Sequence, residues 1–165
     1  MNEYVIKPLK LRNTVPNDRK SIIAGRTAFY VQDESGKPRN APYFDPSHKW
    51  AGAGYLSTAE DLTRFGAALL KPGFLKQSTL DELFRPLETA SGEKTEFALG
   101  WRIGTDKKGR RIVHQPGGGA GISCWMFLYP AESMVITVVS NQTGAPVGGR
   151  VVDAIADSFV AARKR

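Results

Sequence analysis

The clearest periodic pattern in the chain is an apolar stripe in its first half. Leu62, Phe65 and Leu69 recur at helical spacing, which places them on one face of a helix. Ser57 precedes this stripe and is followed three residues later by a glutamate, the spacing of a capping box. The sequence therefore predicts a helix that begins at Ser57 and ends before Pro72.

After residue 96 the pattern changes from helical to strand-like. Apolar, β-branched and aromatic residues fill four short segments, at 97–103, 110–114, 122–129 and 134–140. A glycine-rich corner follows the second of them. Because the connections are short, these segments predict an antiparallel meander over about residues 97–141.

Apolar residues return to helical spacing near the end of the chain. Val152, Ile155 and Phe159 form a stripe that predicts a helix over about residues 147–163. A shorter helix is predicted between Ser78 and Pro86. The chain is thus predicted to be of the α+β class, as a single unit over 1–165, with a helix- and loop-rich part at 1–95 and a sheet with one helix at 96–165.

Charge and composition narrow the function classes. The 165 residues carry a formal net charge of +7, but the basic residues are scattered and the densest groups are short. No aromatic-interleaved basic motif of a nucleic-acid module occurs, so a nucleic-acid-binding domain rests on net charge alone and a solvated surface is the preferred interpretation. No apolar run reaches the roughly 20 residues that a membrane helix needs.

Metal and thiol chemistry have little support. The chain has one cysteine, Cys124, and two histidines, too few for a zinc site, so we predict no metal and no cofactor. Trp125 and Met126 follow Cys124, and nothing around it matches a thiol-protease signature. Cys124 is therefore interpreted as a packed thiol.

Three separated stretches resemble one enzyme family. The first, KWAGAGYLST, ends at Thr58 and leads into the predicted helix. The second is Leu99-Gly100-Trp101, and the third begins at His114 and continues through glycines to Ser140-Asn141. In this order they resemble the C-terminal part of serine β-lactamase-like proteins: class C β-lactamases, penicillin-binding proteins, D-alanyl-D-alanine carboxypeptidases and related esterases. The resemblance covers about residues 8–160 and implies a partial β-lactamase/transpeptidase-like fold, so the unit at 1–165 is expected to be a partial domain.

The chemistry of that family needs three elements. A serine in Ser-x-x-Lys attacks a carbonyl while the lysine helps to remove its proton, and Tyr-x-Asn supplies a second proton-handling group. A Lys-Thr-Gly or His-Thr-Gly strand lines the pocket. Tyr-x-Asn does not occur in this sequence. The one Ser-x-x-Lys, from Ser91 to Lys94, falls in a polar, glycine-containing loop, so we interpret it as a chance match.

The third element is present in altered form. By resemblance His114 takes its Lys/His position and a catalytic role, as a cation or hydrogen-bond donor; the alternative is a strand-end histidine satisfied by its neighbours. Gln115-Pro116 replaces the expected Thr/Ser-Gly, the glycine run is one residue longer, and proline has no N–H to donate. Gly117, Gly118 and Gly119 are candidate substrate-binding residues, and a merely tight turn explains them equally well.

These observations lead to two functional hypotheses. In the first, the complete protein transfers an acyl group from an ester, amide or lactam, acting on a small-molecule or peptide substrate, and this chain alone is inactive because the nucleophile is absent from it. In the second, the chain is a non-catalytic binding or assembly module derived from the family. Under either hypothesis, the predicted partner is the missing N-terminal half or a second copy, joined through an exposed sheet edge.

Overall fold

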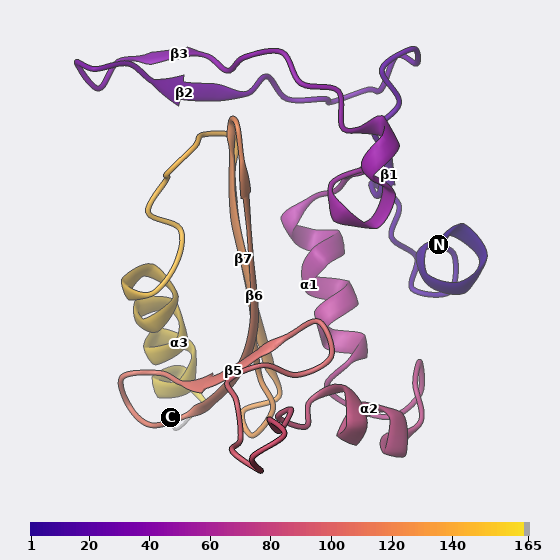
Figure 1. Cartoon of the computed structure of the whole chain (residues 1–165), viewed down its shortest axis with the longest axis vertical. Helices are drawn as coiled ribbons and strands as arrows, with labels where there is room; N and C mark the ends of the chain where they lie inside the picture. The colour runs from indigo at the N-terminus through magenta and orange to yellow at the C-terminus, as the bar shows by residue number, and fades with distance from the viewer. Residues whose placement is uncertain (164–165) are drawn as a thin grey trace.

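The computed structural model describes residues 1–163, so Lys164 and Arg165 lie outside the described residues. Its centre is a four-stranded antiparallel sheet in the order β5-β6-β7-β8, with consecutive strands paired as neighbours. Figure 1 shows the long β6–β7 hairpin rising between two helices, α1 on one side and α3 on the other. The predicted α+β class, with an antiparallel meander and a C-terminal helix, is confirmed.

Short elements make up the first half of the chain. Two-residue and three-residue strands pair as β1 with β4 and β2 with β3. The helices and strands are η1 (Asn2–Ile6), β1 (Val15–Pro16), β2 (Tyr30–Gln32), β3 (Pro38–Asn40), η2 (Ser47–Gly52), β4 (Tyr55–Leu56), α1 (Ala59–Ala68), α2 (Gln77–Leu83), β5 (Arg102–Thr105), β6 (Arg111–Gly119), β7 (Ile122–Tyr129), β8 (Met134–Ser140) and α3 (Arg150–Ala162).

Two strand boundaries differ from the prediction. The first strand of the sheet begins at Arg102, because residues 97–101 fold back on it and leave only an isolated bridge between Phe97 and Arg102. The second continues through the glycines to Gly119, which pairs with Ile122. Glycine weakens a strand, but here seven consecutive pairs with β7 hold it extended. The tight turn is therefore shorter than the predicted corner.

The two faces of the sheet carry separate apolar clusters. On one face Val113, Met126 and Leu128 pack with residues from α1 and α2. On the other face Phe127 and Ile136 belong to a cluster that includes Val152 and Ala156 of α3. Neighbouring residues of one strand thus pack on opposite faces of the sheet, as the two-residue period of a strand requires. The result is a helix–sheet–helix arrangement with α1 and α3 on opposite faces (Figure 1).

Helix α1 lies close against the sheet because it presents a glycine there. A Cβ atom on Gly66 would lie 2.8 Å from Cγ1 of Val135 and 3.2 Å from Sδ of Met126. Real Cβ atoms do not approach so closely, so a side chain at this position would push the helix away. Gly66 therefore fixes the distance between α1 and the strands β7 and β8.

The start of α1 differs by one residue from the predicted cap. The N-cap is Thr58, whose hydroxyl accepts a hydrogen bond from the backbone N–H of Asp61. Ser57 instead hydrogen-bonds through its hydroxyl to Thr14. The shift has a physical reason, because Thr58 also has an acidic residue, Asp61, three positions on. Asp61 is also bound by an earlier segment of the chain: it accepts hydrogen bonds from the N–H of Asn13 and from the hydroxyl of Thr14.

Candidate active site

His114 lies near the middle of β6 on the face that packs against α3. Its imidazole stacks on the ring of Phe127 at 5.2 Å between centroids, with 14° between the planes, and on the ring of Trp125 at 5.5 Å and 27°. The strand register explains the stack, since His114 is paired with Phe127 and Trp125 is two residues away on the same face. Aromatic neighbours of this kind hold an imidazole in one orientation.

The surroundings of His114 favour its neutral form. Burial lowers the pKa of His114 below its usual value, and the guanidinium of Arg102 lowers it further, against an opposing effect of Glu96. Its Nδ1 is buried and has no hydrogen-bond partner within residues 1–163. A neutral imidazole can donate one hydrogen bond and accept another, but it supplies no positive charge to a substrate.

The three candidate glycines continue β6 and differ in their surroundings. The space for a side chain at Gly117 is taken by Sγ of Cys124, 2.5 Å from where a Cβ would lie. At Gly118 the nearest atom would be the carbonyl oxygen of Ile122 at 3.8 Å, and at Gly119 no atom lies within 4 Å. Packing thus explains a glycine at Gly117, whereas Gly118 and Gly119 leave the backbone exposed. Burial also raises the pKa of the Cys124 thiol, against the opposing effect of its contact with the Gly117 backbone, which suits the predicted packed role.

Residues that the sequence analysis did not single out fix the turn after these glycines. The hydroxyl of Thr143 donates to the carbonyl of Gly119 and accepts from the N–H of Gly121. Gly121 has a φ of +78° and lies against Phe29, so a side chain there would be strained and would clash. Both partners are far away in sequence, and no local motif indicates them.

The alternation of side chains along β6 separates the predicted site residues. His114 and Gly118 face the α3 side, whereas Gly117 and Gly119 face the α1 side. The structure therefore brings His114 and the glycines onto one strand but not onto one face. The catalytic role of His114 and the substrate-binding role of the glycines stay predictions.

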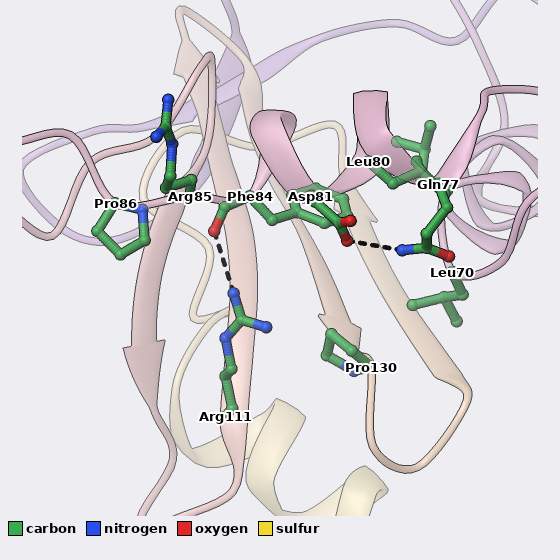
Figure 2. A pocket seen from close by; sticks show the side chains of 10 residues that line it. Leu70, Gln77, Leu80, Asp81, Phe84, Arg85, Pro86, Arg111 and Pro130 are labelled. Carbon is green, nitrogen blue, oxygen red and sulfur yellow. Dashed lines mark hydrogen bonds between the residues drawn. The ribbon is translucent and has the colours of Figure 1, made fainter.

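A cavity lies elsewhere in the described chain, at the end of the sheet near α2. It has a volume of about 350 Å³. Its apolar lining consists of Leu69 and Leu70 just after α1, Leu80 of α2, Phe84, Pro86 and Pro130. Figure 2 shows Arg111 reaching up to donate a hydrogen bond to the Phe84 carbonyl, at 3.0 Å, and Gln77 donating to Asp81 at 2.7 Å. Because these polar groups already bind one another, the cavity has the character of a packing gap. His114 is not part of it.

The remaining sequence motifs have plain structural surroundings. The Ser91 hydroxyl shares a hydrogen bond with Thr89 in an exposed turn, where Glu88 and Lys94 form an antiparallel bridge. A helical arrangement of Ser91 and Lys94 is thus absent from this turn. Trp101 is buried and meets Phe84 edge to face, as core packing predicts.

Across positions 1–163, no group of three or more histidine, cysteine, aspartate or glutamate side chains is arranged to hold a metal ion. No helix in that range is long and apolar enough to cross a membrane.

Known proteins that are similar to this chain support the predicted resemblance to serine β-lactamase-like proteins. The family model described as Beta-lactamase matches residues 1–159. The chain belongs to the beta-lactamase family. The human serine beta-lactamase-like protein LACTB, mitochondrial, is 28% identical to it over 178 residues, and the mouse protein is 29% identical over 178 residues. These alignments cover 93% of the chain but 32% of each relative, so the chain spans about a third of the length of the curated relatives it matches.

Solved structures of the same fold extend this comparison. The penicillin-binding protein from Bacillus halodurans superposes with a TM-score of 0.73 at 19% identity, over 96% of this chain and 48% of its own. The D-stereospecific amidohydrolase from Streptomyces sp. gives 0.69 at 23% identity, over 86% and 43%. At these identities the similarity concerns the fold. The predicted partial β-lactamase/transpeptidase-like fold is confirmed, because the chain covers less than half of either structure.

Proposed function

We propose that this member of the beta-lactamase family works in acyl transfer on an ester, amide or lactam, and that residues 1–165 supply part of a single domain. In the proposed reaction, a serine hydroxyl outside these residues adds to the carbonyl and its proton passes to a neighbouring lysine. The leaving group departs with a proton, and water then releases the acyl group from the serine. Neither metal nor cofactor enters this scheme.

The observation that carries the proposal is the match of the family model over residues 1–159. The resemblance to the family implies that β6 takes the place of its Lys/His-Thr-Gly strand. Under the proposal β6 is the substrate-facing strand. Exposed backbone at Gly118 and Gly119 is available to hold the carbonyl oxygen in the transition state.

Activity measurements on two proteins test the proposal. The complete protein, consisting of this chain with its upstream coding sequence, is expected to hydrolyse a chromogenic lactam or a p-nitrophenyl ester. The 165-residue chain alone is expected to give no turnover above buffer, because it has no activated nucleophile. Turnover by the chain alone that disappears in Ser91→Ala would contradict this proposal and would assign a role to the 88–94 turn.

A non-catalytic binding or assembly module is the second candidate, and Gln115-Pro116 at the motif position favours it. The upstream coding sequence separates the two candidates. An in-frame Ser-x-x-Lys followed by Tyr-x-Asn is expected for the enzyme, and their absence is expected for the module.

The proposed partner is the missing N-terminal half or, in its absence, a second copy of the chain. β8 ends the strand order of the sheet, and its Val139 is 44% exposed. An apolar strand at the edge of a sheet offers unpaired backbone groups to another strand. Strand β7 lies between β6 and β8, and residues 111–114 of β6 lie between β5 and β7.

A further inference from the structure

Two adjacent residues of β6 face different layers of the molecule. Val113 packs in the cluster shared with α1 and α2, and Ile112 packs in the cluster shared with α3. Because side chains alternate along a strand, His114 follows Ile112 onto the α3 side, whereas Gln115 follows Val113 onto the α1 side. A substrate bound against one face of β6 can therefore meet only one of the two side chains.

The α3 side is filled at the level of His114. The rings of Phe127 and Trp125 stack with the imidazole, and they also stack on one another at 5.2 Å. Trp125 is covered in turn by the segment before α3, where a Cβ on Gly148 would lie 2.8 Å from the indole Nε1. This face therefore consists of packed aromatic rings with little room for a reacting group.

The α1 side is open at the level of Gln115. Helix α1 packs over β7 and β8 through Gly66, and Gln115 and Gly119 on β6 are exposed. Beside Gln115 in the sheet are Met126 and then Thr137. The Thr137 hydroxyl is buried without a hydrogen-bond partner in the described chain. The row thus combines an accessible amide with an unused hydroxyl, and none of its three members is charged.

The position of the Lys/His-Thr-Gly element along β6 also favours the open face, on which Gln115 lies. If His114 is the first residue of the Lys/His-Thr-Gly element, its third residue is Pro116, which has a ring and no N–H. If Gln115 is the first residue, the third is Gly117, and the glycine run is no longer one residue too long. A shift of one residue along a strand exchanges the faces, so the two registers place the cleft on opposite sides of the sheet.

We propose that Gln115, and not His114, is the β6 side chain that contacts the substrate, and that the site takes a neutral ester or amide in preference to a compound with a carboxylate at this position. This inference rests on the proposed function. A lysine or charged histidine would pair with a carboxylate, whereas a glutamine amide donates and accepts hydrogen bonds without charge. The side chains of Met126 and Thr137, which lie beside Gln115 in the sheet, add no charge. His114 then serves as a packing residue of the α3 layer.

Kinetics of the complete protein test the assignment with three variants. Gln115→Ala is expected to raise KM for a neutral p-nitrophenyl ester about tenfold, the effect of one lost hydrogen bond. Gln115→Lys is expected to shift the ratio of kcat/KM about tenfold toward a chromogenic lactam that carries a carboxylate. His114→Phe keeps an aromatic ring in the stack, so its kcat/KM is expected within about threefold of wild type, with the same pH profile.

The opposite pattern overturns the inference. Loss of activity or of a pH-dependent limb in His114→Phe, with Gln115→Ala unchanged, assigns the role to His114. If the wild-type protein hydrolyses neither compound, the proposed function fails. The face of the sheet on which the His114 ring lies is then determined separately, by NMR on the 165-residue chain. Nuclear Overhauser contacts from the His114 ring to Phe127 are then expected, and contacts to Met126 or Thr137 would refute the assignment.

Discussion

Asp61 is 2% exposed although it carries a carboxylate. It accepts hydrogen bonds from the N–H of Asn13 and the hydroxyl of Thr14, and it lies in the first turn of α1, where a negative charge meets the positive end of the helix dipole. A segment 48 residues earlier in the chain is thereby attached to the helix. This role of Asp61 is structural.

Asp61→Ala is therefore expected to destabilise the chain by about 2 kcal/mol, because it leaves buried hydrogen-bond donors without a partner. Urea unfolding followed by circular dichroism gives the free energy of unfolding. Glu60→Ala is the matched control: Glu60 is the adjacent residue, and its ion pair with Arg64 lies at the surface, so a change below about 0.5 kcal/mol is expected. Equal effects of the two substitutions would contradict the proposed anchoring.

The contacts of single residues are also the part of the structure that could be predicted least well from the sequence. The motif indicated β6 as the candidate strand, but a single position of register decides whether His114 or Gln115 lies on a given face. The sequence is compatible with both registers. The stack with Trp125 and Phe127 depends on pairing with a later strand. Thr143, which binds the turn after Gly119, has no local signature at all.

At the scale of elements, an ionic network joins the β5–β6 turn to α3. Arg110 donates to Asp106 within the turn and to Asp157 of the helix, the latter at 2.8 Å, and Lys108 lies 3.0 Å from Asp157. Hydrogen bonding with Lys108 lowers the pKa of Asp157 below its usual value, and Arg110 contributes to the same effect. Burial alone would raise the pKa of Asp106, but hydrogen bonds from Arg110 outweigh it and the net pKa is lowered.

This network predicts an acid-sensitive contribution to stability. A carboxylate whose pKa is lowered on folding stabilises the native state above the unfolded-state pKa, and this contribution is lost as pH falls through the native value. Wild-type stability is thus expected to decline more steeply below about pH 4 than that of Asp157→Asn. Glu34→Gln is the control, since Glu34 forms no ion pair among residues 1–163. Parallel pH curves for wild type and Asp157→Asn would argue against a role for the network.

Most elements could be predicted from local pattern. The strands at 122–129 and 134–140 match the structure, and the last helix begins three residues later than predicted. The segment 97–101 is the main exception: its apolar residues suggested a strand, but they fold back beside β5, with Ala98 and Trp101 buried in the core next to Phe84. Only tertiary packing distinguishes these two outcomes.

At the scale of the whole molecule, the edge at β8 predicts self-association of the isolated chain. Sedimentation velocity is expected to show dimers or larger species. Val139→Lys places a charge on the exposed edge strand and is expected to shift the population toward monomer. Ile122→Lys is the matched control, because Ile122 is 38% exposed but lies on β7, which is an interior strand of the sheet and not its β8 edge. A stable monomer in wild type would rule out pairing through this edge.

The same strand has a consequence inside the molecule. Val135 of β8 touches Gly66 of α1, while the next residue, Ile136, packs in the cluster that contains Val152 of α3. Both helices are thus anchored to consecutive positions of one β-strand. If β8 shifts or frays, the two anchor points are displaced together, so neither outer layer can melt away and leave the other intact. We therefore expect thermal denaturation of the described part to be a single cooperative event.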